Sequence, residues 1–141
     1  MGDTQPLPTP RAPLTVWGRV LLVLFFVNGF SAVAGSSGVL KGLLPFPEVW
    51  LQGTPFHSYL VPGLILGVVV GGSQFAAVYF LFRHESLNRI ASLIAGLVLL
   101  GWMIGELALI GFQAPIQVWF VTLGLLEVGL SFTKLRREVT P

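Results

Sequence analysis

Four continuous runs of apolar residues restrict what this chain can fold into. They cover about residues 20–40, 60–82, 90–112 and 116–133. Each run is close to the roughly 20 residues that a helix needs to cross about 30 Å of hydrocarbon. A backbone in lipid must satisfy its own hydrogen bonds, which favours helices, and a transmembrane barrel would instead give short alternating segments. The sequence therefore predicts an all-α membrane protein with four transmembrane helices.

The composition agrees with this class of protein. Of the 141 residues, 54% are hydrophobic and 10% are charged, against roughly 25% charged residues in an average soluble domain. The chain has no cysteine, which excludes disulfides, thiolate zinc sites, iron–sulfur clusters and cysteine nucleophiles. Because the net charge of +2 is small, we expect no nucleic-acid partner.

Basic residues at the ends of the predicted helices indicate their orientation. Lys41 follows the first helix, and the other seven basic residues lie on the opposite side if the chain crosses four times. By the positive-inside rule, both termini and the 83–89 loop face the cytoplasm, so the helices form an up-down bundle. We expect a multi-pass protein of the inner (plasma) membrane. The seven residues are Arg11, Arg19, Arg83, Arg89, Lys134, Arg136 and Arg137.

The bundle is predicted to be a single domain, residues 16–134, between two cytoplasmic tails. Residues 1–15 contain four prolines and are predicted to be disordered, and residues 135–141 form the second tail. An alternative for the first helix is a cleaved signal peptide, because Ala32-Val33-Ala34 matches a cleavage site. Cleavage would leave three spans in the same orientation.

The segment between the first two helices is the longest predicted loop. Its four prolines exclude one continuous helix through residues 41–62. Its aromatic residues are typical of the membrane–water interface, so we expect a structured outer loop that lies on the bilayer surface or dips into it. These aromatic residues are Phe46, Trp50, Phe56 and Tyr59.

Glycines spaced four residues apart predict close packing of helices. One face of the second helix carries Gly63, Gly67 and Gly71, and one face of the third carries Gly101 and Gly105. Small residues at this spacing allow two helix backbones to approach closely. We favour packing between helices two and three within one chain, and the alternative is the face of a homodimer.

Three polar residues are predicted to share one layer of the membrane. Counting 1.5 Å of rise per residue from the inner helix ends places Asn28, Gln74 and Glu127 roughly 10–14 Å from the cytoplasmic edge. An ionisable residue within a span usually faces the bundle interior or water. Because a dry site favours the neutral form of a carboxyl group, Glu127 is expected to donate a hydrogen bond to an amide or to a backbone carbonyl.

Glu106, in the segment LLGWMIGELALIG, belongs to a different layer. It lies roughly 25 Å from the cytoplasmic edge and about 15 Å from Glu127, too far for a paired acid dyad. Trp102 lies one turn away on the same helix face. Further candidates for this outer cluster are His57, Gln52, Gln113 and Gln117.

The two histidines predict no metal or haem site. His57 in the outer loop and His84 in the inner loop lie on opposite sides of the membrane, so they cannot share a ligand. No phosphate-binding loop or paired-carboxylate motif occurs, and no span contains a histidine that could activate a serine. We therefore expect no cofactor, and a membrane redox or lipid-modifying enzyme is disfavoured.

A resemblance is carried by residues 61–106, VPGLILGVVVGGSQFAAVYFLFRHESLNRIASLIAGLVLLGWMIGE. A glycine-rich second helix leads through a short basic turn into the third. In this block and in its four spans, the chain resembles small bacterial membrane proteins, including the DoxX-like group and several uncharacterised families. Gln74 stands in the second helix, where DoxX-like proteins usually have an acidic residue. The resemblance implies the fold, and no site residues are transferred from it.

Together these features predict a small integral membrane protein without catalysis of its own. It would be an accessory or structural subunit, or would bind a lipophilic molecule between its helices beneath the 45–62 loop. Its partners would be membrane lipids, other membrane-protein subunits or a second copy of the chain. The alternative is an oligomeric proton-coupled transporter or channel that uses Glu106 and Glu127. A purely structural role for these glutamates, worth about 1 kcal/mol per interhelical hydrogen bond, is a further interpretation.

Overall fold

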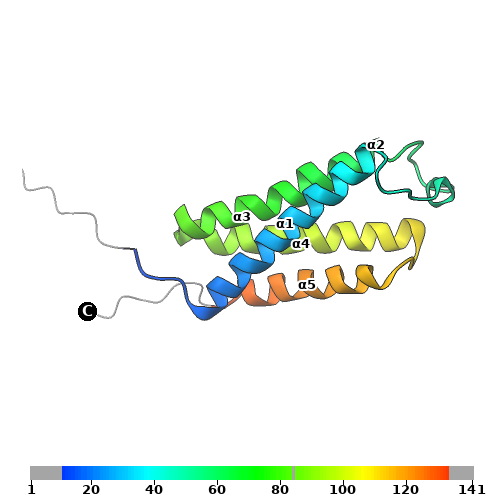
Figure 1. The fold of residues 1–141 in the computed structure, drawn as a ribbon. Coiled ribbons are helices and arrows are strands. Elements are labelled where there is room, and N and C mark those ends of the chain that lie inside the picture. The colour runs from blue at the N-terminus through cyan, green and yellow to red at the C-terminus, as the bar shows by residue number, and fades with distance from the viewer. Residues whose placement is uncertain (1–10, 84, 134–141) are drawn as a thin grey trace, which may run out of the picture.

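The computed structural model describes residues 11–83 and 85–133 and is a bundle of four helical segments (Figure 1). Successive segments run in opposite directions, and the described residues contain no strand. The prediction of an all-α, four-helix fold is therefore confirmed. The segments are α1 (Val16–Leu40), the continuous stretch Leu60–Arg83, α4 (Glu85–Ile110) and α5 (Pro115–Ser131).

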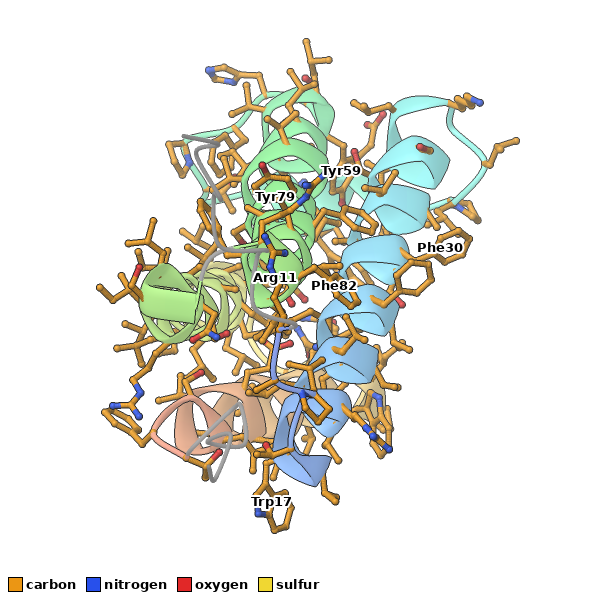
Figure 2. All side chains as sticks on the ribbon, turned by 90° about the vertical axis from the view of Figure 1, so that its left-hand side faces the viewer. Arg11, Trp17, Phe30, Tyr59, Tyr79 and Phe82 are labelled. Carbon is orange, nitrogen blue, oxygen red and sulfur yellow. The ribbon has the colours of Figure 1, made fainter. Side chains whose placement is uncertain are left out.

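Three of the four segments are long and apolar enough to cross a membrane, namely Val16–Leu40, Leu60–Arg83 and Ser86–Ile110. The fourth, α5, is equally apolar but has 17 residues. The outside of the bundle carries large apolar side chains: Trp17 is 52% and Phe30 65% exposed, and both point away from the helices (Figure 2). A continuous apolar exterior of this kind is stable in lipid and unfavourable in water.

Local interactions determine where α1 begins and where it ends. Thr15 precedes the helix, and its hydroxyl accepts a hydrogen bond from the Gly18 amide at 3.1 Å, as a helix N-cap does. At the other end, Gly42 adopts the left-handed region with a φ of 66°, and the Leu43 amide donates to the Gly38 carbonyl at 2.8 Å. This is the hydrogen-bond pattern of a Schellman motif, in which glycine ends the helix without strain.

The second segment changes its hydrogen bonding along its length. It begins as α2 (Leu60–Leu64), continues as the π-helical stretch η2 (Ile65–Gly71) and ends as α3 (Gly72–Arg83). Pro62 lies in the first turn of α2, where a missing N–H costs no helical hydrogen bond. Valine and glycine have low α-helix propensity, and the sequence of η2, ILGVVVG, consists largely of these two residues.

The loop between α1 and α2, residues 41–59, folds back on itself at one end of the bundle (Figure 1). It contains a short 3-10 helix, η1 (Glu48–Leu51). The ring of Phe46 lies 5.5 Å from that of Trp50 and 5.9 Å from that of Tyr59, measured between centroids. The Tyr59 hydroxyl donates to the Pro47 carbonyl at 2.7 Å, which joins the two halves of the loop. We call this the loop end of the bundle.

The glycines of the second segment pack against α1, which corrects the prediction that they pack against the third helix. A Cβ atom added at Gly67 would lie 2.5 Å from the Ser36 hydroxyl, and one at Gly71 would lie 2.9 Å from a Val33 methyl carbon. Gly63 likewise faces Leu40 and Val39. The physical reason is the path of α1, which crosses the bundle diagonally along η2 and α3 (Figure 1).

Gly101 and Gly105 of the third predicted helix pack against no other element of the described chain. A Cβ atom added at either glycine would meet nothing within 4 Å beyond its chain neighbours and the nearby backbone of its own helix. Close approach involves other glycines instead: a Cβ at Gly96 would lie 2.9 Å from a Val128 methyl carbon of α5, and one at Gly29 would lie 3.2 Å from Gln74 Cβ. The predicted glycine face of the second segment therefore packs closely against another helix, whereas the predicted face of α4 does not.

The remaining bounds shift by a few residues. The third helix begins at Glu85 instead of residue 90. Its first residues are polar, so the apolar run begins later in the sequence than the helix does. Within the predicted N-terminal tail, Arg11 donates a hydrogen bond to the Phe82 carbonyl near the end of α3. Residues 1–10 and 134–141, including Lys134, Arg136 and Arg137, lie outside the described residues, and so does His84.

Candidate functional site

A cavity of about 550 Å³ lies at the loop end, between the loop, the α2–η2 stretch and α4. The space exists because the helices separate toward this end, where α2 and the outer half of α4 diverge (Figure 1). Nearly all of its wall is apolar. The lining residues are Val39, Phe46, Trp50, Leu51, Thr54, Phe56, Tyr59, Pro62, Gly63, Ile65, Leu66, Val69, Val70, Val98, Gly101, Trp102, Gly105, Glu106, Leu109 and Ile110.

Glycines on α4 contribute space to this cavity. Gly101 and Gly105 both line it, and neither would bring a Cβ within 4 Å of another residue. On its side the cavity is bordered by Val69 of η2, which is 50% exposed, and by Leu109 of α4, which is 45% exposed. Both of these lining residues are therefore only about half-buried.

The loop covers the cavity, and its polar side chains at the cavity wall already make hydrogen bonds within the loop. The Thr54 hydroxyl donates to the Leu51 carbonyl at 2.8 Å and accepts from the Phe56 amide at 3.2 Å. The Tyr59 hydroxyl donates to the Pro47 carbonyl. Burial, together with the nearby Glu48 carboxylate, raises the pKa of Tyr59 above its usual value, so the phenol keeps the proton that it donates.

The carboxyl group on the cavity wall is Glu106, held by a glutamine of α5. Gln117 is buried, and its Nε2 donates to Glu106 Oε1 at 2.8 Å. Its Oε1 accepts from the backbone amides of Gln113 at 2.7 Å and Ala114 at 3.2 Å. Backbone N–H groups only donate, so they determine which end of the Gln117 amide faces Glu106. The other oxygen, Glu106 Oε2, has no hydrogen-bond partner in the described part of the chain.

The predicted outer cluster forms in part. Glu106 and Trp102 line the cavity together, and Gln117 contacts Glu106 from behind. Gln113 instead donates its side-chain N–H to the Ile110 carbonyl and is exposed. His57 and Gln52 are also exposed and do not line the cavity, although Phe56 does. Sequence position alone does not say which loop side chains turn inward.

The predicted inner layer forms a buried hydrogen-bonded cluster, in which Glu127 accepts from two side-chain amides instead of donating as expected. Asn28 Nδ2 of α1 donates to Glu127 Oε1 at 2.7 Å, and Gln74 Nε2 of α3 donates to Glu127 Oε2 at 3.0 Å. Gln74 Nε2 also lies 3.2 Å from the Ala95 carbonyl of α4. Glu127 and Gln74 are fully buried, and Asn28 is 2% exposed. All four helical segments therefore meet at one carboxyl group.

Small residues allow this meeting. Four further buried polar residues, on α1, α4 and α5, were not predicted from the sequence. Gly96 brings α4 against α5 at Glu127 and Val128, and Gly29 brings α1 against α3 beside Gln74. Serine and asparagine in an apolar run carry little signal of their own, although a spacing of four residues from a known polar residue marks the same helix face. The missed residues are Ser36, Asn88, Ser92 and Ser131.

The two clusters differ in what they can do chemically. Glu127 has a partner on both oxygens and no access to the cavity, so it joins helices. Glu106 lines an apolar space and has a hydrogen-bond partner on one oxygen only among the described residues, so it leaves an acceptor available for a ligand. No group of three or more acidic, histidine or cysteine side chains that could hold a metal ion gathers within residues 11–83 and 85–133.

The fold and its apolar exterior define a membrane protein with three or more helices suited to cross a bilayer. No protein-family model, no curated protein and no solved structure matches the chain. The resemblance to the DoxX-like group therefore stays a prediction. Only the geometry of the two glutamate clusters and the cavity bears on the function.

Proposed function

We propose that this protein, without catalysis of its own, holds a lipophilic molecule in the cavity beneath the 41–59 loop. One observation carries the proposal: about 550 Å³ of space has an apolar wall with one carboxyl group, Glu106, among the described lining residues. Ligand pockets are typically about 300–1,000 Å³, mostly apolar, and contain a few placed polar groups. Filling such a space with an apolar molecule is favourable because its wall gains contacts.

The proposed topology places both termini and the α3–α4 turn in the cytoplasm and the loop end outside. Arg11, Arg19, Arg83 and Arg89 belong to the end opposite the loop, and Lys41 to the loop end. This distribution follows the positive-inside rule for the inner (plasma) membrane. With 17 residues, α5 reaches about 25 Å, the lower limit for a fourth span.

In this topology we propose that the cavity is open to lipid between η2 and α4. Val69 and Leu109, two half-exposed lining residues, belong to helices that are long and apolar enough to cross a bilayer. A lipophilic molecule would therefore enter from the bilayer between η2 and α4. Membrane lipids would be the first class of molecule to reach the cavity by this route.

Native mass spectrometry of the protein, extracted in mild detergent from the membranes in which it is made, tests the proposal. We expect a monomer that carries an added mass of a few hundred daltons, the size of a lipid or a similar molecule. Substitution Gly101→Leu places a side chain in the cavity and should abolish the adduct. The matched control is Gly129→Leu on α5, because Gly129 also has open space around it but does not line the cavity. A bare monomer for the unmodified protein contradicts the proposal.

The same measurement separates the alternatives. Co-purified protein subunits would support an accessory or structural role. A homo-oligomer without an adduct would support the oligomeric transporter, in which Glu106 and Glu127 are the proton sites. That outcome would lead to a transport assay in vesicles, where Glu106→Gln and Glu127→Gln should each stop proton-coupled uptake while the helical content stays unchanged.

A further inference from the structure

The polar groups on the cavity wall restrict the head group that a ligand can present. Thr54 and Tyr59 use their hydroxyl groups for contacts within the loop. Glu106 Oε1 is taken by Gln117, which its own backbone contacts hold in place. Glu106 Oε2 remains as an acceptor without a partner in the described chain. The described lining residues include no lysine, arginine or histidine.

From this arrangement we infer that the ligand is an uncharged or cationic amphiphile whose head group donates a hydrogen bond, from a hydroxyl or an amine, to Glu106 Oε2. The inference rests on the proposed function, because it assumes that the cavity is a ligand site. A carboxylate oxygen accepts hydrogen bonds and cannot donate them. A hydroxyl or ammonium hydrogen therefore complements the one free polar atom that Glu106 presents.

Other head groups fit this wall poorly. An anionic head, such as a sulfonate or phosphate, would lie beside a carboxyl group without a basic residue to balance its charge, and burying an unpaired charge is costly. A head that only accepts hydrogen bonds would have to use the indole N–H of Trp50 or Trp102. It would cover Glu106 Oε2 without giving it a donor, and an acceptor left unsatisfied when a ligand buries it is costly.

Four probes with matched alkyl chains test the inference: hexadecanol, methyl tetradecyl ketone, hexadecane sulfonate and hexadecane. Each would be added in trace amounts to the protein in lipid nanodiscs, and binding would be measured by displacement of radiolabelled hexadecanol. We expect hexadecanol to bind roughly tenfold more tightly than the ketone or the alkane, about the effect of one net hydrogen bond. The sulfonate should bind most weakly.

The variant Glu106→Gln should remove most of the preference for hexadecanol over the ketone, because an amide nitrogen can donate to the ketone oxygen. The matched control is Glu48→Gln, which removes a carboxylate from the loop that does not line the cavity. It should leave the order of the four probes unchanged. Thermal unfolding of both variants shows whether either change acts through a loss of folding.

The possible failures are distinguishable. If hexadecane, ketone and alcohol bind equally, the cavity binds lipophilic molecules and the proposed function stands, but the inference about the head group is wrong. Tightest binding of the sulfonate or of the ketone also overturns the inference. If no probe, including hexadecane, binds to the unmodified protein, both the proposed function and the inference fail.

Discussion

The two glutamates inside the bundle are held by the same kind of partner, a side-chain amide, yet they are left in different states. Glu127 accepts a hydrogen bond on each oxygen, from amides of two other helices, and is fully buried. Glu106 accepts one, from Gln117 on the neighbouring helix, and its side chain belongs to the wall of a cavity. The number of amide donors at each carboxyl group, rather than the glutamate itself, distinguishes the helix contact at Glu127 from the ligand site that we propose at Glu106.

The surroundings of each glutamate reinforce this difference. Near Glu127, glycines at positions 29 and 96 bring helix backbones together, so no space remains. Near Glu106, glycines at positions 101 and 105 face open space, so the cavity extends along the helix. Glycine therefore allows close helix packing near Glu127 and leaves space beside the helix near Glu106. Substitutions in the two regions should have opposite consequences for stability and for binding.

The largest expected effect is the loss of stability in Glu127→Ala. This change leaves one N–H of Asn28 and one N–H of Gln74 without an acceptor, although Gln74 Nε2 keeps the Ala95 carbonyl. Each unsatisfied buried donor costs about 1–3 kcal/mol. We expect the free energy of unfolding to fall by about 3 kcal/mol, measured by titration with sodium dodecyl sulfate in mixed micelles and followed by circular dichroism.

Glu106→Ala is the matched control for that experiment. It removes a group with one amide partner beside open space, so the loss should stay below about 1 kcal/mol, as for an ordinary hydrogen bond. Equal losses for the two variants would contradict the distinction between a closed and an open site.

A smaller effect is expected for Gly96→Ala. The new Cβ would lie 2.9 Å from a methyl carbon of Val128 and 3.0 Å from its backbone nitrogen, and the backbone cannot move aside easily. Overpacking of this kind costs about 1–3 kcal/mol, so the unfolding midpoint should fall. Gly101→Ala on the same helix meets open space, and alanine's higher helix propensity should leave stability unchanged or raised by up to about 1 kcal/mol. A loss in both variants would show that helix α4 needs glycine for another reason.

The fold was predictable from the sequence because its strongest signals are local. Apolar runs of near-membrane length mark the helices, and Pro115 begins α5 as expected for a proline in a first helical turn. The inner cluster was also predictable, because basic residues near the helix ends allow depths to be counted along each helix. Asn28, Gln74 and Glu127, from three separate helices, meet as that count indicates.

The packing partners of the glycine faces were not predictable, for a different reason. A glycine spacing of four residues defines a helix face, but it carries no information about which element that face meets. Gly63, Gly67 and Gly71 meet α1, whereas Gly101 and Gly105 meet empty space. The outcome depends on how α1 crosses the bundle, which is a property of the whole fold. His57 and Phe56 show the same limit in the loop, where neighbouring side chains face opposite ways.

The role of Gln117 can be tested by Gln117→Leu. This side chain accepts from two backbone amides at the start of α5 and donates to Glu106. Losing a cap of this type costs about 1 kcal/mol, and the freed Glu106 carboxyl should bind hexadecanol with less preference over the ketone. Gln113→Leu, at an exposed neighbouring position, should change neither quantity. An unchanged preference in Gln117→Leu would show that Glu106 does not need this partner to face the cavity.

The smallest expected effect concerns the loop. Tyr59→Phe removes the hydroxyl that joins residue 59 to the Pro47 carbonyl, and a single net hydrogen bond is worth about 0.5–1.5 kcal/mol. Because the loop is local, the loss should appear as faster hydrogen–deuterium exchange in residues 43–58, with little change in global unfolding. His57→Ala changes an exposed side chain of the same loop that does not line the cavity, so exchange should stay as it is. Faster exchange in His57→Ala would show that the histidine supports the loop after all, and would return it to the candidate site.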